Sequence, residues 1–539
     1  MAFCLIKPLA EQFKKDLKDG TLNPDKLYDM STPERRAFFG SRYGGETNGR
    51  EINGLFESKM VLKDFKKGAI DWAKQVSGLK PEVRRDFLAR VEKLDHVLNP
   101  GEEELFLQDL VSKKVGTEVT YEQAQKINEL AKKAEEAKAD MSTEAKRVEY
   151  GKAYLEFKDY VDSISPNSVT LADNIFGLAR SIKVIGDLGM PFRQGWGMIS
   201  RPQWATAFGS MFKYLMSEKY FQGLRSDIVS RPNYLNGAYK KAGLRLGPLL
   251  SQKVAQREED WMTTYAGKLP IVKNIERANI GFIYKLRADV FDLLHESAEL
   301  SGENVKDPEV LHQLANVVND FTASGNLGEN DQFANLAPKL NATFFSARKI
   351  SATINMMNPK RYVTGSPTAR KAAQRQLIGS LMLSAAFLGI AAAFGAKVET
   401  DPNSSDFGKF VVGKYHVDVT GGNATYATLL KRIITGKSKS STTGKETKLG
   451  TGYKGQTRAD LMVNFTRNKL APLAAVVADY FFQTDQPDLL RGEFTVKNEL
   501  RNTFEPMLIN DFIDLVLEGD SLSIPFFLMG YFGNSVNKY

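Results

Sequence analysis

The chain has 539 residues, of which 42% are hydrophobic and 25% are charged, and both values are ordinary for a globular protein. Its 73 Lys and Arg residues against 64 Asp and Glu residues give a net charge of +9, which over this length is a weak indication of nucleic-acid binding. Cys4 is the only cysteine, which excludes an intramolecular disulfide and a disulfide-stapled secreted scaffold. The length predicts two to four domains. The apolar run after Met1 is too short for a signal peptide, so we expect folding in a reducing cytoplasm.

The first 163 residues predict two helical segments. Residues 1–118 are typical of an N-terminal domain of short helices separated by turns. Ser31 and Glu34 have the spacing of a capping box, and Thr120 with Gln123 opens another helix by the same logic. Residues 119–163 contain two Ala-, Lys- and Glu-rich runs, which predict a helical hairpin with solvated charged faces.

Residues 164–375 predict an aromatic-rich helical body, with helices over 271–300 and 308–321. Aromatic residues such as Trp196, Trp204 and Phe208 alternate there with cations such as Arg201 and Lys213. This pattern is typical of a helical core with lysines reaching to the surface. It also suits a surface on which bases stack and phosphates bind, and the sequence leaves both interpretations open.

Residues 376–398 predict an apolar helix, because no charged residue lies between Gln376 and Ala396. A helix of that length spans roughly 30 Å, the thickness of the hydrocarbon core of a bilayer. Its eight large apolar residues favour membrane insertion by a total of about 2.5–5 kcal/mol, which is marginal. The helix therefore either inserts conditionally into a membrane or is buried in a core or between subunits. The predicted contact residues are Leu377, Leu381, Ala385, Leu388, Gly389 and Ala393, among which small residues recur every four positions.

Residues 399–460 predict the one strand pair of the chain, a small β-hairpin near 407–420 around Gly413 and Lys414. A flexible loop follows over 435–455. Its cations and those just before it face one acidic residue, Glu446, and predict contact with DNA phosphates or lipid headgroups, with solvated disorder as the alternative. The predicted contact residues are Lys431, Arg432, Lys437, Lys439, Lys445 and Lys448. Residues 461–539 predict a C-terminal helical segment.

Together these elements predict a mainly α, elongated, multi-segment protein with one small β-hairpin. No catalytic residue, metal site or cofactor motif emerges from the sequence. The sequence at 435–438 resembles the end of a phosphate-binding loop, but Lys431 stands where that loop requires glycine. The pair Glu57-Ser58 resembles the catalytic acid region of phage wall-degrading transglycosylases, without that family's downstream Gly-Leu-Met-Gln element. We therefore expect a protein that is not an enzyme.

A series of short motifs carries a resemblance to a known group of proteins. The order is DLGMPFRQG at 187–195, NIERAN at 274–279, KLRAD at 285–289, FFSAR at 344–348, MNP at 357–359, SSDFGK at 404–409, TGG at 420–422, TGK at 435–437 and NKLAP at 468–472. This order resembles the C-terminal region shared by large polyvalent proteins and internal virion proteins of tailed bacteriophages, over roughly residues 165–500.

The resemblance implies a virion component, carried in the head or at the portal and delivered with the genome. It implies synthesis in the bacterial cytoplasm, a place in the virion, and the host envelope as a destination after ejection. The implied partners are the portal, other ejection proteins, further copies of this chain, DNA and the host membrane. The alternatives are a static head–tail or capsid-associated structural protein and a wall-degrading virion enzyme using Glu57.

Overall fold

The computed structural model describes residues 3–75, 81–94, 104–105, 108–109, 111–112, 115–164, 188–247, 270–327, 344, 346–440, 444–451, 456–471, 474–476, 478, 529, 531 and 535–538. The fold is mainly α, as the sequence predicts. The chain forms two compact units. The first contains residues 1–132 and 164–166, and the second contains residues 133–163 and 167–539. The finer division into six segments stays a prediction.

The first unit is built from α1 (Phe3–Lys18), α2 (Pro24–Tyr28), α3 (Thr32–Tyr43), α4 (Glu46–Gln75), α5 (Pro81–Lys93) and the start of α7 (Tyr121–Lys138). The predicted capping box at the start of α3 is present, with Ser31 and Glu34 bonded to each other. The Thr120–Gln123 cap of α7 is also present. Phe13, Phe39 and Phe56 form the centre of this unit's core.

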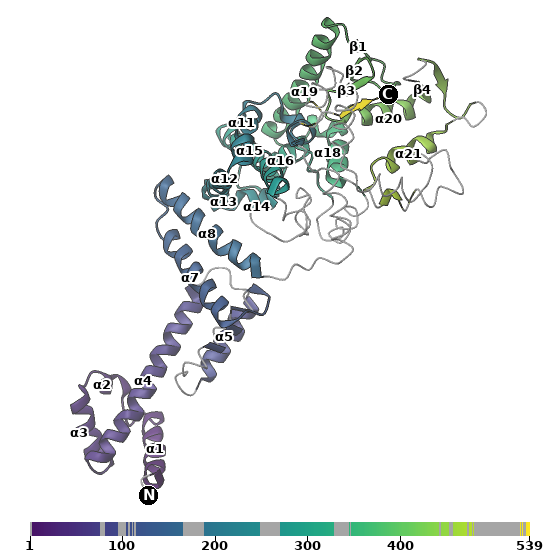
Figure 1. Ribbon diagram of the computed structural model, residues 1–539. Helices are drawn as coiled ribbons and strands as arrows, with labels where there is room; N and C mark the ends of the chain where they lie inside the picture. The colour runs from purple at the N-terminus through teal and green to yellow at the C-terminus, as the bar shows by residue number, and fades with distance from the viewer. Residues whose placement is uncertain are drawn as a thin grey trace. The chain divides into compact units, whose positions relative to one another are not determined.

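The second unit holds the remaining helices of the described chain (Figure 1). They are α8 (Glu144–Ile164), α10 (Met190–Arg193), the 3₁₀ helix η1 (Trp196–Met198), α11 (Pro202–Met216), α12 (Glu218–Ser230), α13 (Pro232–Leu235), α14 (Ala238–Ala242), α15 (Pro270–Leu300), α16 (Pro308–Phe321), α18 (Ala347–Met357), the 3₁₀ helix η5 (Pro359–Tyr362), α19 (Pro367–Ala393), α20 (Asn423–Thr435) and α21 (Arg458–Arg467). Helices α15 and α16 confirm the two helices predicted over 271–300 and 308–321.

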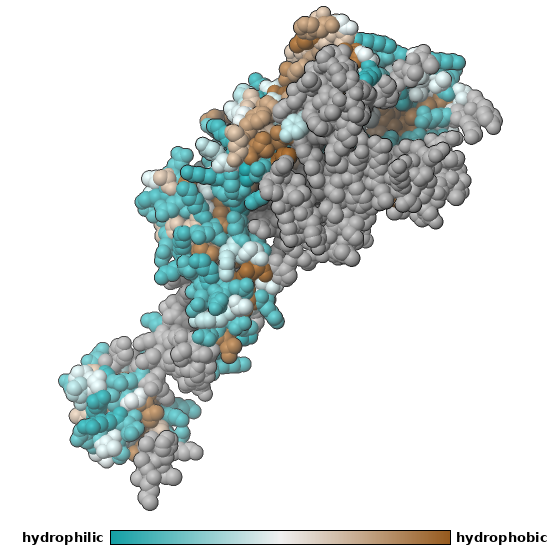
Figure 2. Space-filling view, in the orientation of Figure 1, coloured by the Kyte–Doolittle hydropathy of each residue, from teal (hydrophilic) through white to brown (hydrophobic). Residues whose placement is uncertain are grey.

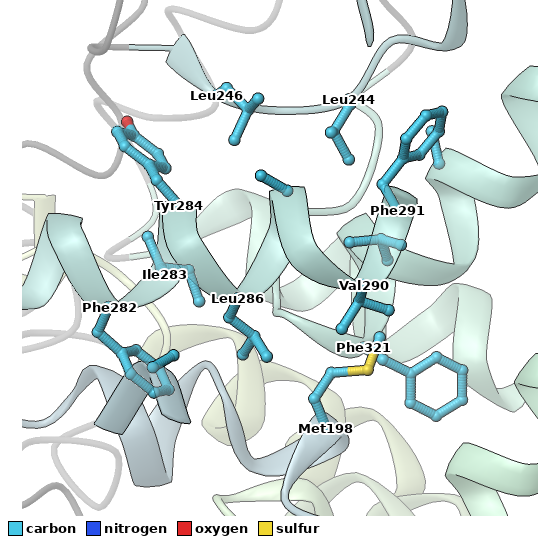
Figure 3. Packing of buried hydrophobic residues seen from close by; sticks show 14 of the residues in the cluster. Met198, Leu244, Leu246, Phe282, Ile283, Tyr284, Leu286, Val290, Phe291 and Phe321 are labelled. Carbon is cyan, nitrogen blue, oxygen red and sulfur yellow. The ribbon is translucent and has the colours of Figure 1, made fainter. Parts of the chain in front are cut away.

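Helix α15 lies at the centre of the main core of the second unit, because the side chains of its middle are buried almost without exception. Even Arg287 is fully buried there, where it donates hydrogen bonds to the hydroxyl and the carbonyl of Thr322. Phe282, Tyr284 and Phe291 on α15 are fully buried, and Met198 and Phe321 pack in the same cluster (Figure 3). The aromatic stretch before it belongs to this core. Trp204 is buried and stacks on Phe208 with ring centroids 5.1 Å apart, so the core interpretation of that stretch holds for these residues.

The β structure is larger than the sequence predicts. The expected hairpin is confirmed as β2 (Lys409–Val412) and β3 (Tyr415–Asp418), joined by Gly413 and Lys414. It lies inside an antiparallel sheet of order β1-β2-β3-β6, with β1 at Lys397–Val398 and β6 at Ser535–Lys538. The prediction of a single strand pair was therefore wrong, because β1 and β6 satisfy the two outer edges of the hairpin.

The predicted flexible loop over 435–455 was also wrong in part. Strand β4 (Lys437–Lys439) pairs with β5 (Glu446–Lys448) as an antiparallel ladder. The prediction of a helical end to the chain fails at β6, which is a strand. The first residues of that predicted C-terminal segment are helical, as the end of α21, and residues 479–528 lie outside the described residues.

Candidate functional site

The apolar helix α19 begins nine residues before the uncharged run and is fixed there by polar contacts. Ser366 is its N-cap, and the Ser366 hydroxyl accepts a hydrogen bond from the amide of Ala369 at 3.2 Å. Glu303 accepts hydrogen bonds from the Ser366 hydroxyl and from the Thr368 amide. The start of the helix is therefore anchored to the body of the second unit.

The first third of α19 packs into the main core. Ala369, Ala372 and Ala373 are buried in the cluster that surrounds α15. Gln376, which is fully buried, ends this stretch. Its Oε1 accepts a hydrogen bond from Nε of the buried Arg201 at 2.8 Å, and its Nε2 donates to the carbonyl of Gly197 at 2.9 Å. Gln376 thus provides a hydrogen-bond acceptor for the buried guanidinium of Arg201 at the N-terminal end of the uncharged run.

One side of the uncharged run stays in contact with the protein from Gly379 to Leu388. A Cβ on Gly379 would lie 2.4 Å from the Ser200 hydroxyl, so the helix passes very close to the body there. The Ser384 hydroxyl donates to the carbonyl of Val419 at 3.3 Å. Leu388 packs against the apolar cluster of the small sheet. We call this the packed face of α19.

The opposite face of α19 is exposed. Only 11% of its most apolar 18 residues are buried. On this face Ile378, Leu381 and Met382 are 56–68% exposed. Beyond Leu388 the other side of the helix is exposed as well, with Ile390 56% and Phe394 88% exposed. Figure 2 shows the resulting hydrophobic surface at the end of α19. We call the face that carries Ile378, Leu381 and Met382 the open face. Among the described residues, α19 is the one helix long and apolar enough to cross a membrane.

The six predicted contact residues divide between these two faces. Leu377 is half-buried against the main core, and Leu388 is half-buried against the sheet. The other four are exposed, namely Leu381, Ala385, Gly389 and Ala393. A Cβ on Gly389 would meet no atom within 4 Å, so the predicted small-residue stripe is open to close approach by another surface. Gly395, with a φ of 86°, ends the helix.

The predicted basic residues also divide into two groups. Arg432 donates to the carbonyl of Asn403 at 2.8 Å. Lys439 forms ion pairs with Glu399 and Asp401, and the contact with Glu399 raises the pKa of Lys439. These two side chains hold β4 in place. Lys431, Lys437, Lys445 and Lys448 are exposed, with Lys437 paired to Glu446 at 3.3 Å.

An exposed apolar pair on α20 was missed by the sequence reasoning. Leu430 and Ile434 are 48% and 69% exposed and flank Lys431 on one face of the helix. Their spacing of four residues beside a lysine was the signal that could have found them. The exposed surface of α20 therefore combines apolar side chains with positive charge.

The catalytic alternative has little support in the geometry around Glu57. Hydrogen bonds from Asn53 and Arg35 lower the pKa of Glu57, and Arg35 lies 3.1 Å from its carboxylate. A glycosidic general acid needs the opposite shift, since it must hold a proton near neutral pH. Among the described residues, no group of three or more His, Cys, Asp and Glu side chains is arranged to hold a metal ion.

No protein-family model, curated protein or solved structure matches this chain.

The physical property that distinguishes α19 is its exposed apolar surface, which no part of the described chain covers. Burying a large apolar side chain yields about 1.5–3 kcal/mol. The exposed parts of Ile378, Leu381, Met382, Ile390 and Phe394 therefore represent several kcal/mol of unrealised burial. A lipid or protein surface can supply it.

Proposed function

We propose that this chain is a non-enzymatic virion protein of the internal or ejection type found in tailed bacteriophages, and that it binds the host membrane through α19. The observation that carries the proposal is the open face of α19, an apolar helix face that the second unit leaves in water. The order of sequence motifs supports the phage assignment. The proposed activity is assistance of genome delivery across the host envelope.

In the particle, we propose that neighbouring proteins cover the open face. Ala385, Gly389 and Ala393 would let another helix approach closely, so further copies of this chain, the portal or other ejection proteins are suitable partners. On ejection the same face would exchange protein for lipid. The marginal insertion energy of the run, about 2.5–5 kcal/mol, makes that exchange reversible.

The exposed lysines of α20 and of the β4–β5 ladder would contribute an electrostatic attraction. Near an anionic membrane each Lys or Arg contributes about 1 kcal/mol. Lys431, Lys445 and Lys448 are exposed and suit this role, and DNA phosphates offer the same chemistry. Arg432 and Lys439 are excluded from it, because their side chains already bind Asn403, Glu399 and Asp401.

Flotation with vesicles containing anionic lipid tests the membrane role. Gly389→Asp places a charge on the open face where a side chain meets no protein atom. A charged Asp costs about 2.5–3.5 kcal/mol at the centre of the apolar layer and less near its surface. We therefore expect vesicle affinity to fall by roughly tenfold or more. Gly209→Asp in α11 is the matched control, because Gly209 is also an exposed helical glycine with open space around it. Equal binding by both variants would contradict the proposal.

Mass spectrometry of purified virions, before and after triggered DNA release, tests the virion assignment. We expect the chain in intact particles and its depletion after release. Presence in the particle without any vesicle binding would favour the static head–tail or capsid-associated role, in which α19 stays covered by protein. Absence from virions would remove the phage assignment.

A further inference from the structure

The two faces of α19 determine how this helix can meet a bilayer. The packed face is held at successive points along the uncharged run, at Gly379 by Ser200, at Ser384 by Val419 and at Leu388 by the sheet cluster. The ring of Phe387 also lies 6.1 Å from that of Trp196. A helix that spans a membrane must exchange these contacts for lipid or other helices around its whole circumference.

The contacts on the packed face belong to the fold of the second unit. Leu388 covers Tyr415 and Val417 at the centre of the four-stranded sheet. Withdrawing the helix would expose that cluster and leave the Ser384 hydroxyl without its acceptor. The open face needs no such rearrangement, since its side chains already lie in water.

The open face presents an apolar strip to the surroundings, while the folded body of the second unit covers the other side of the helix. Ile378, Leu381, Met382, Ala385 and Gly389 recur at intervals of three and four residues, which places them on one side of the helix. No charged residue interrupts them. Exposed cations stand at the two ends of the run, at Arg375 and Lys397, where they complement anionic headgroups of one leaflet.

From this arrangement we infer that α19 binds an anionic bilayer lying in the plane of one leaflet, with its open face in the lipid and its packed face still on the second unit. The helix does not cross the membrane while the second unit is folded. The exposed pair Leu430 and Ile434 beside Lys431 offers a second shallow contact of the same chemistry. This inference rests on the proposed membrane binding and specifies its geometry.

A one-sided labelling experiment on the full-length protein tests the inference. Replacing the single cysteine by Cys4→Ser gives a background without thiols. Lys371→Cys and Thr400→Cys then place one thiol near each end of the run, both at exposed positions. The protein is bound to sealed vesicles with anionic lipid, and a membrane-impermeant maleimide is added outside.

We expect both thiols on vesicles to stay reactive toward the reagent added outside, because both ends stay on the outer side. Protection of one end with continued reactivity of the other would show a crossing helix and overturn the inference while leaving membrane binding intact. Failure to bind vesicles at all would overturn the proposed function and this inference with it.

Nitroxide labels at Met382→Cys, Gly389→Cys and Ala393→Cys supply an independent readout. In-plane binding predicts one common shallow depth, about 5–10 Å below the headgroup boundary. A crossing helix predicts depths that differ along the membrane normal, because 382 and 393 are separated by roughly 16 Å of helix. A label at Gly209→Cys, in the water-exposed α11, is the control that should stay accessible to aqueous relaxation agents.

Discussion

A hydrogen bond between the buried side chains of Gln376 and Arg201 fixes the N-terminal end of the apolar run to the body of the second unit. Gln376 is fully buried and Arg201 is 8% exposed. Burial, with a smaller contribution from Arg375, lowers the pKa of Arg201 to about 10, so the guanidinium is still protonated at neutral pH. Gln376→Met keeps the length and approximate volume of the side chain and removes only its hydrogen-bonding atoms.

The expected cost follows from the two hydrogen bonds that are lost. A hydrogen bond to a charged group contributes about 1.5–3 kcal/mol, and the carbonyl of Gly197 loses a partner worth about 1 kcal/mol. The thioether is more apolar than the amide, which offsets about 1 kcal/mol of that loss. We therefore expect Gln376→Met to lower the free energy of unfolding by about 1.5–3 kcal/mol.

Urea denaturation followed by circular dichroism measures this change. Gln376→Glu keeps an acceptor for Arg201 and should be less destabilising than Gln376→Met. Gln374→Met is the matched control, because Gln374 lies two residues earlier and is exposed, and its cost should stay within about 0.5 kcal/mol. Native-like stability of Gln376→Met would refute the reasoning, since it would mean that the buried guanidinium needs no partner.

Two further predictions concern the packing and the charge of the second unit. A Cβ on Gly281 would lie 2.4 Å from the ring of Tyr214, so Gly281→Ala should destabilise the protein by about 1–3 kcal/mol. Gly209 has open space around it, so Gly209→Ala should stabilise the protein by about 0.5–1 kcal/mol. Thermal or urea unfolding measures both changes, and equal effects would contradict the packing argument. Burial, with smaller contributions from nearby cations, lowers the pKa of Lys349 to about 7 from the 10.5 of an ordinary lysine. Between these pH values the unfolded chain therefore binds more protons than the folded protein. As a result, stability falls as the pH falls from 10.5 towards 7. Lys349→Met should remove about 1.4 kcal/mol of this dependence per pH unit between pH 7.5 and 9, and an unchanged slope in urea titrations at the two pH values would refute it.

Local signals in the sequence predicted the elements that local interactions build. The Ser31–Glu34 box and the start of α16 at Pro308 depend on neighbours within a few residues. The β2–β3 hairpin likewise depends on the adjacent Gly413. Strand β6 pairs with β3 across more than a hundred residues, and a register of that kind leaves no local trace in either strand.

The β4–β5 ladder was missed for a different reason. Its residues are mostly Lys, Thr and Ser, a composition that resembles a solvated linker. The order there comes from tertiary contacts. Arg432 and Lys439 tie the segment to the chain at Asn403, Glu399 and Asp401. Composition alone treats all six predicted basic residues as equivalent, whereas only the fold separates the structural cations from the exposed ones.

The apolar run itself was predictable, but the division between its faces was not. Leu377, Leu381 and Leu388 are chemically alike in the sequence, yet the first and last pack on the protein and Leu381 is 60% exposed. Almost the whole circumference of the helix is apolar or small, so no amphipathic pattern indicates which side faces the body. The contacts of Gly379 and Ser384 decide that orientation.

Small residues lie on both sides of α19, and they have a different effect on each side. On the packed face, Gly379 and Ser384 allow the body to approach the helix backbone closely. On the open face, Ala385 and Gly389 leave the backbone equally approachable by a partner. Large apolar residues all round would favour lipid so strongly that the helix would insert or aggregate before assembly. The modest apolarity of this helix therefore suits a surface that is first covered by protein and later by lipid.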